Sequence, residues 1–195
     1  MLPQVVTYLP GLRPLSTMEL YTDTYYIQRI QAGDVACFAC LLDKYSRPIN
    51  SLILKVVQNQ EEAEELAQDT FMKVFKNLAS FKGDCSFSTW IYRIAYNTAV
   101  SETRRRKREW ACIDQARLAN LPDSEAERMD AWEGRQEFLD ALTRAVGELE
   151  PEERALVTLF YYEEYSVSEC AGITQMSESN IKVRLHRIRK KLYIL

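Results

Sequence analysis

The stretch Phe81–Arg108 places the strongest constraint on what this chain can fold into. From Phe87 onward its apolar residues recur at helical spacing and predict a long amphipathic helix. The polar loop before the helix contains Gly83, which supplies a flexible turn position. That loop and the first turn offer three candidate N-caps, Asp84, Ser86 and Ser88. A second stripe on one sector of the same helix contains Trp90, Arg93, Asn97, Ser101, Arg104 and Arg108.

This second stripe has the side-chain chemistry of a nucleic-acid surface. Guanidiniums suit phosphates, amides suit base edges, and an aromatic ring suits an unstacked base. The stripe continues into a basic run over residues 104–108. The alternative interpretation is an amphipathic helix with a solvated basic end, because basic residues also complement the dipole at a helix C-terminus. The stretch alone leaves both interpretations open.

The composition predicts a soluble, mainly helical protein of one domain or two small ones. The chain has 195 residues, is 47% hydrophobic and 27% charged, and contains only 6 Gly and 6 Pro. No apolar run is long enough to span a membrane, so we expect no membrane insertion. Residues 1–23 resemble a disordered leader rather than a signal peptide, and Met18 is an alternative start.

The cysteines predict reduced thiols in the cytoplasm, since five of them occur without a secretory signal. Cys37 and Cys40 form a lone CxxC with no second Cys or His pair, and helical spacing explains them as core residues. We therefore expect no metal site and no cofactor. No Gly-rich phosphate loop or nucleophile–base pair is present either, and we expect no enzyme activity.

Charge is distributed in blocks along the chain, although the net charge is only −3. From Asn180 to the C-terminus there are six Lys and Arg and no acid, whereas residues 114–153 are strongly acidic. This pattern predicts a modular protein whose basic parts meet nucleic acid.

The N-terminal module is predicted over residues 24–108. Helical periodicity is interrupted at Gly33, with Asp34 as an N-cap, and Pro48 is expected to begin a further helix. Residues 61–78 form a near-ideal amphipathic pattern whose exposed face carries Glu61, Glu65, Gln68, Asp69 and Met72. That face is either a solvated surface or a docking site for a basic partner helix.

The C-terminal module is predicted over residues 136–195, after an acidic linker at 109–135. Its last two helices indicate a helix-turn-helix, with Ser177 as the N-cap of the second helix. The predicted outer face of that helix carries Ser179, Asn180, Lys182, Arg184, Arg187 and Lys190. The first three can reach base edges, and the last three are better placed for phosphates.

Motifs in both modules resemble bacterial RNA polymerase sigma factors of the extracytoplasmic-function (ECF) group. Residues 65–71, 81–84 and 87–97 look like region 2 of that family, and residues 168–171 and 181–187 look like region 4. Two motifs in the right order make the resemblance specific. Cys170 stands where the family usually has Ile, and Gln175 occupies a turn position where Gly is common.

The resemblance implies an all-α fold of two small helical domains, and a promoter-directing initiation factor that helps to melt the −10 element. It implies docking on the clamp helices of core RNA polymerase through Glu61, Glu65, Gln68, Asp69, Phe71 and Met72. It implies −10 recognition by the loop Lys82, Gly83, Asp84, Cys85 and Ser86 with Trp90, Arg93, Asn97, Arg104, Arg105 and Arg108. Region 4 would read the −35 element as duplex.

The same resemblance implies three kinds of partner: core RNA polymerase, promoter DNA and an anti-sigma factor. The acidic linker would thread the nucleic-acid channel of the polymerase, where negative charge stands in for RNA. The competing hypothesis is a stand-alone helix-turn-helix regulator with a sensing or dimerising N-terminal half. Only the docking face and the arginine-ended helix separate the two, since a regulator needs the C-terminal module alone.

Overall fold

The computed structural model describes residues 21–114 and 135–194, with side chains at 21–108 and 139–194. Within these ranges all regular structure is helical, and the predicted all-α fold class is confirmed. Most of the predicted leader and most of the linker lie outside the described residues. None of the described helices combines the length and apolarity needed to cross a membrane. The chain divides into two compact units, residues 1–44 and 45–195.

The first unit contains helix α1 (Asp23–Gln31) and a 3-10 turn, η2 (Val35–Cys37). Gly33 separates them with φ of +100°, as the sequence predicted for this break. Asp34 does not cap the following turn with its side chain. Its carboxylate instead accepts hydrogen bonds from Arg29 Nη2 at 2.6 Å and Cys37 Sγ at 3.3 Å.

Helix α2 (Phe38–Val57) is continuous, so the prediction that Pro48 begins a new helix is wrong. A proline inside a helix loses one backbone hydrogen bond and costs about 3 kcal/mol. The residues after it carry a helical stripe that is completely buried, comprising Ile49, Leu52, Ile53 and Val56. Burying each of these side chains contributes about 1.5–3 kcal/mol. The sum exceeds the cost of the proline, and the helix runs through it.

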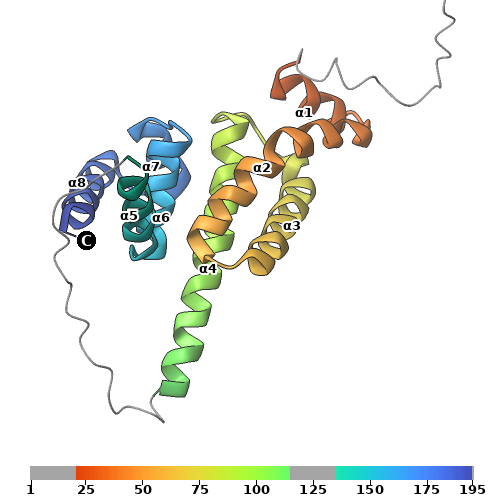
Figure 1. Ribbon diagram of the computed structural model, residues 1–195. Helices are drawn as coiled ribbons and strands as arrows, with labels where there is room; N and C mark the ends of the chain where they lie inside the picture. The colour runs from red at the N-terminus through yellow and green to blue at the C-terminus, as the bar shows by residue number, and fades with distance from the viewer. Residues whose placement is uncertain (1–20, 115–134, 195) are drawn as a thin grey trace, which may run out of the picture. The chain divides into compact units, whose positions relative to one another are not determined.

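Helices α3 (Gln60–Asn77) and α4 (Phe87–Asp114) lie side by side in the second unit (Figure 1). Asn59 begins α3, and its side chain accepts a hydrogen bond from the Glu62 N–H at 2.9 Å. A short 3-10 turn, η3 (Leu78–Ser80), and the loop after it connect the two helices. Helix α4 continues six residues past the Arg108 at which the predicted N-terminal module ended, to Asp114.

The C-terminal helices are α5 (Arg135–Gly147), α6 (Pro151–Val157), α7 (Val167–Thr174) and α8 (Glu178–Ile194), with a π-helical turn, η4 (Thr158–Tyr162), after α6. Local signals set these boundaries. Pro151 lies in the first turn of α6, and a capping box between Ser166 and Glu169 begins α7. Gln175 ends α7 in the left-handed region at φ 60°, at the turn position where the resembled family commonly has Gly.

A compact apolar core holds α5–α8 together as a second helical domain. Its fully buried side chains come from α6, η4, α7 and α8 and comprise Leu156, Leu159, Ile173, Ile181 and Ile188. They recur at helical spacing on α8 and on α6 with its π-helical turn, as an amphipathic pattern requires. The division of the fold into two helical domains agrees with the sequence prediction.

Candidate functional site

An exposed stripe runs along α3 at spacings of three and four residues. It comprises Glu61, Glu65, Gln68, Met72 and Phe75, and we call it the α3 stripe. Met72 is 56% exposed and Phe75 is 45% exposed, so the stripe presents apolar as well as acidic groups to solvent. Asp69 is exposed beside it. The predicted polar face of residues 61–78 therefore exists as one continuous surface.

Two phenylalanines of α3 differ from the sequence analysis. Phe71 was assigned to polymerase docking, but it is 8% exposed and belongs to the core, so it supports the stripe from behind. Phe75 was not among the residues predicted on the exposed face of 61–78, yet it is exposed. The signal that identifies Phe75 is its position three residues after Met72, which continues the exposed stripe by one turn.

The loop Lys82–Ser86 leads directly into α4. Gly83 has φ of +81°, in the region that favours glycine, and Lys82 and Asp84 are exposed. Of the three candidate caps, Ser86 is the one used, since its Oγ accepts from the Thr89 N–H at 3.1 Å. The Ser86 hydroxyl is therefore engaged in starting α4.

Three aromatic rings pack together where the loop joins the helix. The Trp90 ring centroid lies 5.1 Å from that of Phe81 and 5.7 Å from that of Phe87. Phe81 and Phe87 meet edge to face at 5.8 Å. Trp90 is thus a half-buried member of an aromatic cluster behind the loop.

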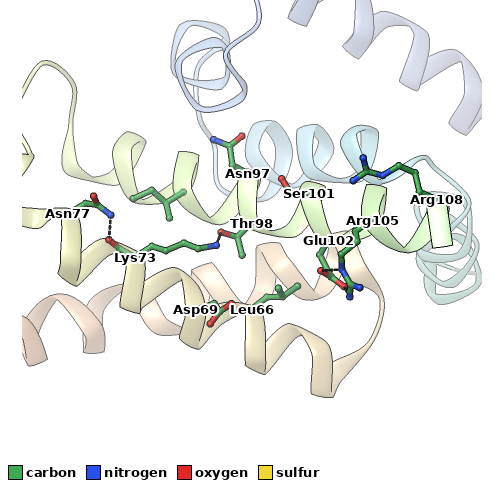
Figure 2. A pocket seen from close by; sticks show the side chains of 11 residues that line it. Leu66, Asp69, Lys73, Asn77, Asn97, Thr98, Ser101, Glu102, Arg105 and Arg108 are labelled. Atoms are coloured by element: carbon green, nitrogen blue, oxygen red, sulfur yellow. Dashed lines mark hydrogen bonds and ion pairs between the residues drawn. The ribbon is translucent and has the colours of Figure 1, made fainter.

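A groove of about 600 Å³ lies between α3 and α4 (Figure 2). The polar residues of α4 that line it include Asn97, Ser101, Arg105 and Arg108. The other wall comes from α3 and includes Lys73 and Asn77, which the sequence analysis did not select. Lys73 Nζ donates to Thr98 Oγ1 at 3.0 Å across the groove. Lys73 and Asn77 are four residues apart on α3, a spacing that predicts a shared helix face. The spacing does not predict which neighbouring helix that face contacts.

The predicted second stripe of α4 is not one continuous surface. Arg93 is directed at α7, where its Nε donates to the Gly172 carbonyl at 2.8 Å. Arg104 is directed at the start of α6, where its Nη2 lies 3.0 Å from Glu152 Oε1. The structure thus brings Asn97 together with residues 101, 105 and 108 but directs Arg93 and Arg104 elsewhere.

The basic run of α4 is paired with acids. Arg105 donates to Glu102, and this hydrogen bond lowers the pKa of the Glu102 carboxyl. Arg106 forms an ion pair with Glu62 of α3. Arg108 is exposed and lines the groove. Its guanidinium is the one in this run best placed to meet a phosphate.

Helix α8 has the geometry that the sequence predicts for a recognition helix. Ser177 Oγ accepts from the Asn180 N–H at 3.3 Å and so caps the helix. The inward face carries Ile181, Leu185 and Ile188. Five of the six predicted contact residues are exposed, namely Ser179, Asn180, Lys182, Arg187 and Lys190. Arg184 is half-buried at the edge of this face.

Comparison with known families gives one match that includes α3 and one that includes α8. Residues 41–109 match the family model for Sigma-70 region 2, and residues 139–192 match that for Sigma-70 region 4. The chain belongs to the ECF group of sigma factors. The two matches together cover both helical domains, including α3, α4 and α8. Sigma factors are transcription initiation factors that associate with RNA polymerase, and the hypothesis of a stand-alone regulator does not fit.

Relatives align along most of their length. The RNA polymerase sigma-H factor of Pseudomonas aeruginosa is 29% identical over 187 residues, covering 87% of this chain and 91% of the relative. The ECF sigma factor SigW of Bacillus subtilis is 28% identical, with coverage of 85% and 92%. The ECF sigma-E factor of Escherichia coli K12 is 27% identical, with coverage of 89% and 94%.

Two solved structures share the fold. CnrH in complex with the cytosolic domain of CnrY superposes with a TM-score of 0.61 at 21% identity, covering 88% of this chain and 95% of CnrH. The sigma factor RpoE of Bartonella quintana, in complex with the anti-sigma factor NepR, gives a TM-score of 0.61 at 22% identity, with coverage of 80% and 93%. At these identities the likeness concerns the fold.

Proposed function

We propose that this sigma factor divides its work among three surfaces: the α3 stripe docks on core RNA polymerase, the loop Lys82–Ser86 with the α4 groove holds the opened −10 strand, and α8 reads the −35 duplex. The observation that carries the proposal is the continuous exposed α3 stripe, because a DNA-binding regulator has no use for it. The three surfaces lie on different helices, so each can be tested separately.

The α3 stripe has the composition of a docking surface. Met72 and Phe75 expose apolar area at its C-terminal end, and Glu61 and Glu65 lie toward the N-terminus with Asp69 beside them. An apolar patch bordered by charge is typical of a protein–protein contact. The acidic groups favour a partner helix rich in Lys and Arg, as the family resemblance implies for the clamp helices of the polymerase.

The loop and the groove have the features needed to hold an unpaired strand. Separating and unstacking a base costs a few kcal/mol, which binding to the protein must offset. Gly83 leaves the loop backbone open to close approach, and the aromatic cluster behind it gives the loop a rigid support. In the groove, the Asn97 amide and the Arg108 guanidinium offer hydrogen bonds to a base edge and a phosphate.

Helix α8 presents its N-terminal residues for base contacts and its later residues for phosphates. Asn180 and Lys182 lie within the first turns of the helix, which is the part of a recognition helix that enters the major groove. Arg187 and Lys190 follow on the exposed face, where they suit phosphate contacts. Arg184 lies at the border between these two groups.

Other properties of the protein follow from this role. We propose region 2 at residues 24–108, a linker at 109–135 and region 4 at 136–195. We also propose that the protein acts in the cytoplasm and has no enzyme activity.

CnrH and RpoE of Bartonella quintana were each solved with a bound partner, and the partner of RpoE is an anti-sigma factor. We propose an anti-sigma partner for this chain as well.

The proposal is tested by titrating purified core RNA polymerase with the labelled protein and by transcription in vitro. Glu65→Lys with Asp69→Lys is expected to weaken core binding at least about tenfold, because opposite charge at a docking rim becomes like charge. Glu164→Lys with Glu178→Lys is the matched control, since both residues are exposed and the change in charge is the same. Unchanged core binding in the first variant would contradict docking by the α3 stripe.

A further inference from the structure

The outer face of α8 contains an apolar side chain among its polar and basic ones. Val183 is 46% exposed, and before Tyr193 it is the only large apolar residue of this helix that is exposed. Its neighbours at spacings of three and four residues are polar and exposed, namely Ser179, Asn180, His186 and Arg187. The base and phosphate contacts proposed for this face use its polar residues and leave Val183 without a role.

Val183 lies at the centre of this outer face. The buried stripe of α8 consists of Ile181, Leu185 and Ile188. At about 100° per residue, Val183 lies almost directly opposite the middle of that stripe. The helix begins at Glu178, which places Val183 in its second turn. Val183 therefore projects away from the core of its own domain and toward the surface that α8 contacts.

Branching at Cβ holds the two methyl groups of Val183 in a fixed direction. A valine in a helix adopts one χ1 rotamer in about 90% of cases, so little side-chain freedom is lost when a partner covers it. Valine is also a weaker helix former than alanine, lysine or arginine, and an exposed valine buries little area within the protein. The stability of α8 therefore gives no reason for valine at this position.

The major groove of DNA offers an apolar group that suits such a side chain. Each base pair presents its own pattern of hydrogen-bond donors and acceptors there, and thymine adds a C5-methyl group that apolar side chains contact. A recognition helix brings its first turns to the base edges. Val183 is the exposed apolar residue in those turns of α8, beside Asn180, which is suited to a base-edge hydrogen bond.

We propose that Val183 reads the methyl group of a thymine in the −35 duplex, and that the promoters this sigma factor uses carry thymine at that position. The proposal rests on the function proposed above for α8. Val183 follows Asn180 by three residues, a rise of about 4.5 Å along the helix, and successive base pairs are about 3.4 Å apart. The thymine therefore lies within about two base pairs of the base that Asn180 contacts.

Replacing thymine by deoxyuridine tests this proposal at a single methyl group. Uracil keeps the pairing with adenine and the major-groove acceptor of thymine, and lacks only the methyl group. The probes are duplexes that the complex of the full-length protein with core RNA polymerase selects from a random library. Each thymine of their −35 element is replaced in turn. One of these replacements is expected to weaken binding by the parent about three- to fivefold, the effect of exposing one buried methyl group.

Variants of Val183 show whether this side chain reads the methyl group. Val183→Ala removes both Cγ methyl groups and is expected to bind the thymine and deoxyuridine duplexes equally well. Val183→Thr keeps one of them and is expected to retain part of the preference. Tyr193→Ala, which removes an exposed apolar side chain from the last turn of α8, is the matched control and is expected to retain all of it. The same preference for thymine in Val183→Ala as in the parent would trace the effect to DNA shape and overturn the proposal.

A comparison with Arg187→Ala separates this proposal from the function proposed for α8. Val183→Ala is expected to leave the salt dependence of binding unchanged, because contact with a methyl group releases no counterion, whereas Arg187→Ala lowers it. If no duplex is selected, or if Arg187→Ala binds the selected duplexes as tightly as the parent, α8 does not contact DNA and both proposals fail. Weaker binding by Arg187→Ala without a thymine whose methyl group matters overturns the reading by Val183 alone.

Discussion

Helices α4 and α8 are both strongly basic, but they differ in how many of their charges are paired with acids. From Arg104 to Lys107 every basic side chain of α4 is paired with an acid, while in the described part of the chain Lys182, Arg187 and Lys190 of α8 form no ion pair. The difference arises from tertiary structure, since residue types and spacing are similar. A basic run in a sequence therefore indicates that a surface is positively charged. It does not show whether those charges are free to bind nucleic acid.

The acids that pair with α4 come from three different elements. Glu62 lies at the start of α3, Glu102 lies on α4 itself, and Glu150 and Glu152 lie at the start of α6. Two of the four therefore belong to the C-terminal domain. The pairing of Arg104 and Lys107 therefore depends on acids of the C-terminal domain.

The largest effect is expected from Arg154→Ala, which removes the buried guanidinium between the domains. The Val56, Gly147 and Leu149 carbonyls lose their donor, and an unsatisfied buried group costs about 1–3 kcal/mol. Because Arg154 Nε itself lacks a hydrogen-bond partner among the described residues, we expect a net loss of about 2–4 kcal/mol in the free energy of unfolding. Urea denaturation measures this, with Arg154→Lys expected to be intermediate. A loss under about 1 kcal/mol would show that the arginine does not hold the domains.

A smaller effect is expected from Asn180→Ala on duplex recognition. One good base contact in the major groove is worth about 1–3 kcal/mol of discrimination. The variant is expected to bind the −35 duplex more weakly and to lose preference at one base pair, because Asn180 is exposed in the first turn of α8. Fluorescence anisotropy with the parent site and its single-base variants measures the preference. An unchanged preference would mean that α8 does not read bases with this residue.

Arg187→Ala and Arg104→Ala compare the two helices directly. Each phosphate contact contributes about 0.9 to the slope of log affinity against log salt. Arg187→Ala is expected to lower that slope by about this amount for duplex binding by the free protein. Arg104→Ala is expected to leave the slope unchanged, since Glu152 already pairs with Arg104. Equal slopes for the two variants would remove the distinction between α4 and α8.

The smallest effect is expected from Lys107→Ala. Lys107 Nζ lies 3.7 Å from Glu150 Oε2, and the two side chains are 79% and 61% exposed. Exposed ion pairs contribute about 0–1 kcal/mol. We expect a change in the free energy of unfolding under about 0.5 kcal/mol, measured by urea denaturation. A larger loss would show that this exposed ion pair contributes to stability as much as a buried contact does.

Periodicity and capping chemistry predicted much of this fold. Ser177 was found because its role depends on the nearest turn of backbone. Pro48 was misread because the burial that carries α2 through it comes from tertiary contacts, which outweigh a local preference. The same limit applies to Phe75, because tertiary packing and not residue type sets its exposure.

In the candidate sites, too, features set by one helix were predicted and features set by tertiary contacts were not. Exposure of the α3 stripe and of α8 followed from amphipathic spacing, since each face is set by its own helix. The split of the α4 stripe could not be predicted, because Arg93 and Arg104 are directed by contacts with residues more than forty positions away in the chain. Lys73 and Asn77 were missed for the same reason, as their role depends on the groove formed with α4.

The most direct test of the account is promoter opening by the complete polymerase complex. Permanganate reactivity of promoter thymines is measured for the parent and for Asn97→Ala, on duplex DNA and on a premelted bubble. The account predicts normal core binding by Asn97→Ala, weak reactivity on duplex DNA and partial recovery on the bubble, where the unpairing cost is already met. Normal reactivity of Asn97→Ala on duplex DNA would contradict strand binding by the α4 groove.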